Sequence, residues 1–214
     1  MTEYHKIQSM FERDPENLKR LVIGAWTFPE FEYLANNPWD YTEKVDGTNI
    51  RVTVHQKGDI LFGGKTDAAS IQAPLLKRLA ERFHPQERLL LEKFPFGATL
   101  YGEGYGARIQ KGGGNYRQDQ DFVLFDVLVT SEDGRQWWLR RPDIEDVAAT
   151  LRLDIVPIIG RGTLHDMIEI VKNGFKSQWG DFVAEGIVAR PTTELRARGG
   201  ERIITKLKHR DFRV

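Results

Sequence analysis

The chain has 214 residues, enough for one substantial hydrophobic core but few for two full-sized domains. Its 31 basic and 31 acidic residues cancel, so no overall field attracts nucleic acid. The absence of cysteine excludes disulfides, thiolate metal sites and a cysteine nucleophile, and it favours a reducing, cytoplasmic compartment. We expect no association with membranes, because no apolar run is long enough to cross one and the N-terminal residues are polar.

The first convincing strand follows an Asp-Gly turn. Residues 49–55 (NIRVTVH) alternate in polarity, and Lys57-Gly58-Asp59 then turns the chain into a second strand at 60–62. The turn Glu132-Asp133-Gly134 predicts another hairpin. Further strands are predicted by runs of β-branched and aromatic residues at 98–103, 121–129, 136–139, 185–190 and 202–208.

Helical periodicity is found in three segments. Residues 73–83 repeat apolar side chains on one face and carry a proline in the first turn. Residues 143–151 follow a proline and begin with an acidic turn, and residues 163–173 begin at a threonine cap and end at Asn173-Gly174. Because strands follow strands and helices are interspersed irregularly, the pattern predicts an α+β fold with antiparallel sheets.

The charges are unevenly distributed along the chain. From Glu194 to Val214 there are seven basic residues and three acidic ones. A basic segment of this kind is either a solvated end or a phosphate-binding surface, and the sequence leaves both interpretations open.

Short charged and glycine-containing motifs recur at predicted turns and strand ends. In chain order they are KVDG (44–47), YGEG (101–104), DFVLFD (121–126), EGIV (185–188) and KLK (206–208). Each motif alone is common, whereas all five in this order are a specific signal.

These motifs resemble those of the covalent nucleotidyltransferase superfamily, which comprises polynucleotide ligases and RNA capping enzymes. Within it the chain is most similar to the ATP-dependent RNA ligases of the RNA-ligase-2 type, and the resemblance runs from Lys44 to Lys208. It implies a nucleotidyltransferase (adenylation) domain, an α+β, ATP-grasp-like ligase core of antiparallel β-sheets flanked by helices.

The resemblance implies that Lys44 attacks ATP and becomes linked to AMP. A lysine attacks only as the neutral amine, whereas its unperturbed pKa is about 10.4. Lys206 and Lys208 alternate with Leu207, so on a strand both ammonium groups point the same way and can favour neutral Lys44 while offsetting phosphate charge. The alternative is an exposed edge strand whose lysines discourage aggregation.

The resemblance also implies nucleotide and metal ligands. Glu103 would bind the ribose or organise the metal ion, and Glu185 would hold Mg²⁺ or Mn²⁺ near Lys44. Phe125 would stack on one face of adenine and Val188 on the other, although a buried sheet position is the alternative for Phe125. Further nucleotide contacts are expected from Glu43, Asn49 and Lys65. Related ligases more often carry arginine at the position of Lys65.

The predicted function is ATP-dependent joining of RNA 5′-phosphate and 3′-hydroxyl ends, at free ends or nicks, as in RNA repair. RNA contacts are expected from the basic segment, through Arg196, Arg198, Arg202 and Arg210. A DNA ligase and a GTP-dependent capping-type nucleotidyltransferase would use the same lysine, whereas a non-catalytic RNA-binding module would need no nucleophile. We expect residues 1–214 to form a single nucleotidyltransferase domain without an appended OB-fold or C-terminal domain. An accessory protein is therefore a candidate partner for RNA capture.

Overall fold

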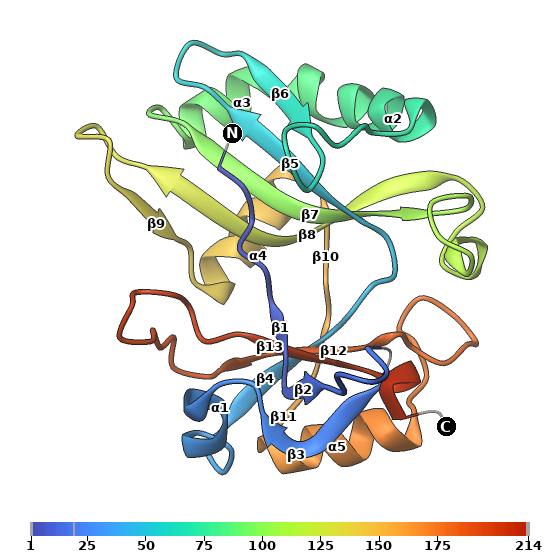
Figure 1. The fold of residues 1–214 in the computed structure, drawn as a ribbon. Helices are drawn as coiled ribbons and strands as arrows, with labels where there is room; N and C mark the ends of the chain where they lie inside the picture. The colour runs from blue at the N-terminus through green and yellow to red at the C-terminus, as the bar shows by residue number, and fades with distance from the viewer. Residues whose placement is uncertain (1, 19, 213–214) are drawn as a thin grey trace. The chain divides into compact units, whose positions relative to one another are not determined.

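The computed structural model describes residues 2–18 and 20–212, which form two compact units (Figure 1). Unit 1 consists of the described residues of Met1–His5 and Asp46–Val156, and unit 2 of those of Lys6–Val45 and Pro157–Val214. The single domain expected over residues 1–214 stays a prediction. In the described part of the chain, no helix combines the length and the apolar character needed to cross a membrane.

Unit 1 is built on a sheet with strand order β10-β8-β7-β5-β6, and β9 pairs with β8. The neighbouring strands are antiparallel except for β10 and β8, which are parallel. The strands are β5 (Thr48–Val54), β6 (Ile60–Gly63), β7 (Ala98–Gly106), β8 (Gln120–Thr130), β9 (Gln136–Trp138) and β10 (Asp154–Ile155). The helices are α2 (Ala73–Phe83), α3 (Glu87–Lys93) and α4 (Arg141–Leu151), with short 3₁₀ turns η1 (His84–Gln86) and η2 (Gly113–Asn115).

Helices pack on one face of the unit 1 sheet. Ile50 of β5 and Leu100 of β7 point to that face and pack in the same core as Leu79 of α2 and Val147 of α4. Side chains alternate between the two faces of a strand. The helix-free face therefore carries the residues between these apolar ones, among them Asn49, Arg51, Tyr101 and Glu103.

Strand β8 has an irregularity at Phe125. Tyr101 of β7 pairs with Asp126 and Gly102 pairs with Leu124, so Phe125 falls between two paired residues. A bulge of this type re-aims a side chain and is common beside binding sites. Phe125 is half-buried whereas Leu124 and Asp126 are buried. The alternative of a fully buried core position for Phe125 is therefore wrong.

Unit 2 contains a second sheet, with strand order β1-β13-β12-β4-β11, and a separate hairpin of β2 and β3 (Figure 1). Strand β12 is antiparallel to both of its neighbours, and β1 is parallel to β13. The strands are β1 (Gln8–Ser9), β2 (Phe11–Arg13), β3 (Leu21–Trp26), β4 (Trp39–Glu43), β11 (Ile158–Gly162), β12 (Gly186–Pro191) and β13 (Thr205–Lys208). The helices are α1 (Pro29–Tyr33) and α5 (Leu164–Asn173), and η3 (His209–Phe212) is a 3₁₀ turn.

Helix α5 covers one face of the unit 2 sheet. It begins with the predicted cap, since the Thr163 side chain accepts from the Asp166 N–H and the Asp166 carboxylate accepts from the Thr163 N–H. The core under this helix is formed by Met167 and Val171 of α5 with Trp39, Tyr41, Ile187 and Leu207 of the sheet. The alternate residues of these strands, including Val188, Lys206 and Lys208, lie on the opposite face.

Most predicted elements are confirmed, including the three helices and the α+β class with mainly antiparallel sheets. The strand predicted at 202–208 is shorter, because β13 begins at Thr205. Ile203 and Ile204 are buried, and the Ile203 N–H donates to the Leu195 carbonyl instead of joining the sheet. The elements not predicted are short: β1 to β4, β10, β11, α1 and α3.

A buried aspartate ties α2 to the start of β8. Asp121 is fully buried and accepts hydrogen bonds from Arg78, Arg82 and Arg117 at 2.8–2.9 Å, and from the Phe122 N–H. Burial alone raises the pKa of Asp121, but the hydrogen bonds from Arg78 and Phe122 and the charges of Arg82 and Arg117 together lower it below its ordinary value. The carboxylate therefore stays ionised and stabilises the folded unit at neutral pH.

We expect Asp121→Asn to lower the free energy of unfolding at neutral pH by about 3 kcal/mol, because three arginines lose a buried counter-charge. A pKa depressed by folding gives stability that is present above the unfolded pKa of about 4 and is lost as the pH falls through the folded value. Chemical denaturation should therefore show the gap between the two proteins narrowing at acid pH. Asp146→Asn, at the exposed ion pair with Lys93, is the matched control. A difference in the free energy of unfolding that does not change with pH would contradict a stabilising role of the ionised Asp121 carboxylate.

Candidate active site

Lys44 lies directly after β4, at the end of the strand. Its N–H donates to the Gly186 carbonyl at 2.9 Å, which extends the pairing of β4 with β12 by one residue. Its ammonium donates to Glu185 Oε2 at 2.6 Å. The Lys44 side chain is 19% exposed and that of Glu185 10%, so this ion pair is sheltered from solvent.

A second lysine reaches the same carboxylate. The Nζ atom of Lys208 lies 2.7 Å from Glu185 Oε1. The register of β12 with β13 pairs Gly186 with Lys208 and Val188 with Lys206, so both lysines share the face that carries Val188. The edge-strand alternative for these lysines is wrong, because β13 lies between β1 and β12.

Glu43 faces the opposite way from Lys44. Its side chain is buried, and its two oxygens accept from the Ser177 hydroxyl at 2.6 Å and from the Gln178 N–H at 2.8 Å. Burial raises the pKa of Glu43, and the two hydrogen bonds counteract this only in part. The side chain therefore fixes the segment after α5 from inside unit 2, and the predicted nucleotide contact of Glu43 stays a prediction.

Unit 1 carries other predicted nucleotide contacts on its helix-free face. Asn49 of β5 pairs with Glu103 of β7, and both are half-buried. The Oδ1 atom of Asn49 is buried and accepts no hydrogen bond from any residue that the structure describes. Because a buried acceptor without a donor costs free energy, this oxygen is suited to a hydroxyl or amino group of a ligand.

An aromatic cluster that sequence reasoning missed surrounds Phe125. The ring of Tyr4 lies edge-on to Phe125 at 5.1 Å and to Trp138 at 5.5 Å between centroids, and 5.0 Å from Tyr101. Its hydroxyl donates to Asp126 Oδ2 at 2.7 Å. The N-terminal residues of unit 1 therefore cover part of the face that carries Phe125. Nothing in the short polar N-terminal sequence indicated this contact.

Lys65 lies in the loop after β6 and is exposed. A fully buried arginine of β5 holds this loop: Arg51 donates from Nε to the Gly64 carbonyl at 2.7 Å and from Nη2 to Asp67 Oδ1 at 2.8 Å. One guanidinium thus holds the loop on both sides of Lys65, through the backbone of Gly64 and the side chain of Asp67. Sequence reasoning missed Arg51, because an arginine in an alternating strand is typical of a solvent-facing position.

The predicted RNA-binding arginines differ in accessibility. Arg196, Arg198 and Arg210 are exposed. The side chain of Arg202 is only 5% exposed, and its Nε donates to Glu194 Oε1 at 2.9 Å. Three of the four are therefore accessible to a large ligand, while Arg202 is held within the unit. RNA contacts of all four stay predictions.

The residues predicted to bind a metal ion are Glu103 and Glu185, one in each unit. Glu185 Oε1 is buried and lies near Lys208 without the alignment of a hydrogen bond, so an oxygen lone pair is available to a ligand. Carboxylate oxygens combined with substrate phosphates and water suit Mg²⁺ or Mn²⁺. Among the residues that the structure describes, no three His, Asp or Glu side chains form a complete protein-only metal site.

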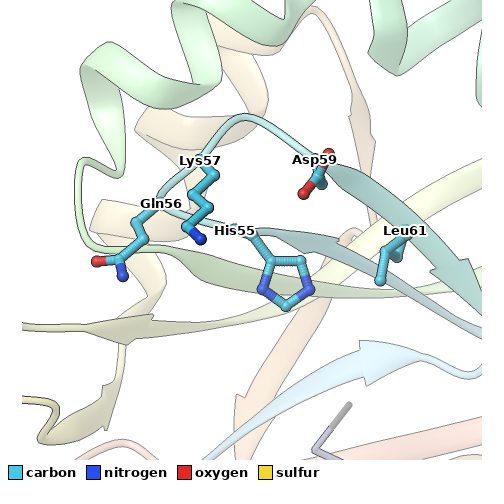
Figure 2. Close-up of a pocket in the computed structure, with 5 residues that line it drawn as sticks. All are labelled: His55, Gln56, Lys57, Asp59 and Leu61. Atoms are coloured by element: carbon cyan, nitrogen blue, oxygen red, sulfur yellow. The ribbon is translucent and has the colours of Figure 1, made fainter.

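A separate pocket lies at the tip of the β5–β6 hairpin (Figure 2). It has a volume of about 360 Å³ and is lined by His55, Gln56, Lys57, Asp59 and Leu61. His55 follows the end of β5 whereas Asn49 is near its start, which separates them by roughly 20 Å at the rise of an extended strand. This pocket is therefore distinct from the predicted nucleotide contacts.

The fold is similar to solved structures of an RNA ligase from Naegleria gruberi. A variant with ATP and Mn matches with a TM-score of 0.64 and 19% identity, over 84% of this chain and 52% of that chain. An apo variant matches with a TM-score of 0.64 and 18% identity, over 96% and 56%. The complex with PPi matches with a TM-score of 0.62 and 20% identity, over 84% and 52%. This chain thus spans about half the length of the proteins it matches.

The fold is therefore that of the RNA ligase nucleotidyltransferase core. The sequence model of the RNA ligase family matches residues 37–208, a range that contains all five motifs. The chain belongs to the RNA ligase family.

Glu185→Gln should lower the free energy of unfolding by about 1–3 kcal/mol, because the charge-assisted hydrogen bond from Lys44 and the ion pair with Lys208 are lost, which leaves two ammonium groups without their shared counter-charge. Adding Lys44→Met to this variant should recover part of the loss by removing one repelling charge. A double-mutant cycle of Lys44 and Glu185 measured by chemical denaturation tests this. Glu92→Gln, at the exposed pair with Arg88, is the control. Additive effects of the two substitutions would show that the ion pair does not form.

Proposed function

We propose that this protein is an ATP-dependent RNA ligase that works through a covalent lysyl-AMP intermediate. The observation that carries the proposal is the arrangement at Lys44. In a chain of the RNA ligase family, Lys44 lies beside Glu185 and Lys208, and Lys206 shares the face of β13 with Lys208. A nucleophilic amine among further cations suits attack on a phosphate.

In the first step the neutral amine of Lys44 attacks the α-phosphorus of ATP. A P–N bond forms, the bond from this phosphorus to the bridging oxygen breaks, pyrophosphate leaves, and the proton lost by the amine passes to solvent. Lys206 and Lys208 offset the negative charge that develops on the phosphate oxygens. Contact with a carboxylate favours the charged form of a lysine. The ion pair with Glu185 is therefore the resting state, and the amine must leave it before attack.

Two transfers complete the reaction. An oxygen of the RNA 5′-phosphate attacks the AMP phosphorus, the P–N bond breaks, and the lysine amine takes up a proton. The RNA 3′-hydroxyl then attacks the activated 5′-phosphate, AMP leaves, and the hydroxyl proton passes to solvent. Each transfer depends mainly on positioning and on charge stabilisation.

A divalent cation would be held by Glu185, with Glu103 as the second predicted ligand, and would supply charge neutralisation at the phosphates. ATP as the nucleotide is supported by the similar Naegleria gruberi ligase structures that contain ATP or AMP with Mn. On the chain's own residues, the buried free acceptor of Asn49 suits a sugar hydroxyl, and Phe125 on its bulge offers a half-buried ring for a base.

The alternative functions can be distinguished by the nucleotide used, by the polynucleotide sealed and by whether the protein is labelled covalently. A capping-type enzyme would transfer GMP from GTP, a DNA ligase would seal DNA in preference to RNA, and a binding module would not be labelled. Incubation with radiolabelled ATP or GTP followed by a denaturing gel distinguishes the capping-type enzyme and the binding module from a ligase, and parallel sealing assays on RNA and DNA distinguish the two ligases. Labelling of the native chain by ATP, and not by GTP, is the expected result.

Replacing Lys44 by Met should abolish the covalent label, because it removes the amine that is proposed to attack ATP. Intact-mass spectrometry after incubation with ATP and Mg²⁺ or Mn²⁺ measures the adduct directly. Lys176→Met is the matched control, since Lys176 also pairs with a carboxylate in unit 2, that of Asp181 at 3.1 Å, and should leave labelling unchanged. An AMP adduct that persists in the Lys44→Met protein would place the nucleophile elsewhere.

We further propose that the basic segment of unit 2 binds RNA. We also propose that the protein works in a reducing compartment and that an accessory protein is a candidate partner for RNA capture. Arg196, Arg198 and Arg210 support this, because they are exposed and close in sequence to the strand that carries Lys206 and Lys208. Binding that rests on phosphate contacts weakens as salt rises, with a slope of about −0.7 per contact for single strands.

Changing Arg196, Arg198 and Arg210 together to Gln should weaken RNA sealing at low salt while sparing lysyl-AMP formation. The salt dependence of RNA binding should become shallower by about 2 in log–log slope, since about three phosphate contacts are lost. The control is the triple change of Arg88, Arg135 and Arg140 to Gln, which removes the same charge from exposed positions of unit 1. An equal fall in adenylation and sealing would mean that the segment serves ATP or the fold.

A further inference from the structure

The loop between β7 and β8 contacts the Asp-Gly turn that follows Lys44. The Tyr116 hydroxyl accepts a hydrogen bond from the Asp46 N–H at 3.1 Å. Gln110 donates from Nε2 to the Gly47 carbonyl at 3.0 Å. Both contacts lie within unit 1, and together they engage the backbone on each side of the Asp46–Gly47 peptide.

The loop itself is anchored at several points. Tyr116 is buried, and its ring lies edge-on to Tyr105 of β7 at 6.1 Å between centroids. The next residue, Arg117, lies over the Tyr105 ring and donates to the buried carboxylate of Asp121. A Cβ atom at Gly113 would overlap the Gly106 carbonyl, so the loop folds tightly back on the end of β7. The Tyr116 hydroxyl therefore has a fixed position within unit 1.

The turn is equally constrained. A Cβ atom at Gly47 would overlap the Gly104 carbonyl of β7, so only glycine permits this close approach. Lys44 is thus flanked by two backbone anchors. Its own N–H is bonded to Gly186 in unit 2, and the N–H of Asp46, two residues later, is bonded to Tyr116 in unit 1.

We propose that Tyr116 is a positioning residue for lysine adenylation, with Gln110 as its second contact. By holding the Asp46 N–H, the Tyr116 hydroxyl fixes the point at which the nucleophile-bearing segment enters unit 1. The backbone two residues after Lys44 is then held in place, which restricts the positions that the Lys44 side chain can reach. Small displacements of a nucleophile from the line of attack slow a reaction strongly. The proposal rests on the proposed function, because it assumes that Lys44 attacks a nucleotide.

The test is Tyr116→Phe, which removes the hydroxyl and keeps the buried ring. We expect the rate constant of lysyl-AMP formation at saturating ATP to fall about three- to tenfold, the value of one hydrogen bond. The ATP concentration giving half the maximal rate should stay unchanged, because Tyr116 is not placed at the nucleotide. Tyr33→Phe, at an exposed tyrosine of α1, is the control and should have no effect.

A second pair of variants tests the same turn without a buried residue. Gln110→Ala should lower the same rate constant, whereas Gln118→Ala should not, because the exposed Gln118 side chain donates to the Gly114 carbonyl of its own loop. If Tyr116→Phe fails to fold, this pair decides the question.

The outcomes separate cleanly. An unchanged rate constant in Tyr116→Phe and Gln110→Ala, or a weaker apparent ATP affinity with an unchanged rate constant, overturns the positioning role. If the melting temperature of a variant falls so far that the protein is partly unfolded at the assay temperature, and this accounts for the slower rate, the residue has a packing role. That result overturns the positioning role as well. If the native chain forms no lysyl-AMP, the proposed function fails first, and the variants are then uninformative about anything but stability.

Discussion

The position of β12 between β4 and β13 is the constraint on which the site in unit 2 depends. Antiparallel pairing on both sides of β12 sets Val188 opposite Thr42 on one neighbour and opposite Lys206 on the other. Because side chains alternate with period two, the cations at the ends of β4 and β13 then share one face. A slip of one residue in β13 would bury Lys206 and expose Leu207, so the hydrophobic core under α5 enforces the register of the site.

The same alternation explains why a glutamate directly precedes the lysine. Glu43 points into the unit, where the Ser177 hydroxyl and the Gln178 N–H hold it, while Lys44 points to the opposite face and meets Glu185. The two glutamates are therefore not equivalent. Glu43 accepts hydrogen bonds from a hydroxyl and a backbone N–H, and burial raises its pKa, whereas Glu185 forms ion pairs with Lys44 and Lys208. Adjacent charges in the sequence serve two separate networks.

The sequence predicts those elements that are specified by interactions between residues close together in the chain. Segment 49–55, helix 73–83 and helix 163–173 carry their own periodicity or caps, and each is found within one or two residues of its predicted bounds. The side chains of β4 alternate between buried and half-buried along the strand. Its two partner strands, β11 and β12, are more than a hundred residues away in the sequence. Strands β1 and β10 are two-residue segments that exist only because a parallel partner is present. No local signal could specify them.

The site shows the same division between motif residues and the residues that hold them. Lys44, Glu185 and Lys208 were predicted from motif order, and the structure brings them together. Arg51, Tyr4, Gln110 and Tyr116 were not, because each acts on backbone or side chains far away in the sequence and none carries a reactive group suggestive of catalysis. Their types are instead those that make directed contacts from rigid strands and tight loops: a buried guanidinium on Gly64, a phenol on Asp126, an amide and a phenol on the Asp46–Gly47 turn.

An excess of positive charge near Lys44 also makes its ion pair with Glu185 compatible with the proposed attack of Lys44 on a nucleotide. The single negative charge of Glu185 is shared between two ammonium groups, so neither lysine is fully neutralised by it. A nucleotide phosphate brings several negative charges and would compete with Glu185 for Lys208, while Lys206 offers a further cation on the same face of β13. As those cations turn to the phosphate, the carboxylate becomes free for other partners, and the remaining barrier for Lys44 is the loss of one proton and one contact. The hydrogen bonds of the Lys44 N–H to Gly186 and of the Asp46 N–H to Tyr116 would then still restrain this segment, whereas the side chain would have lost its ion pair.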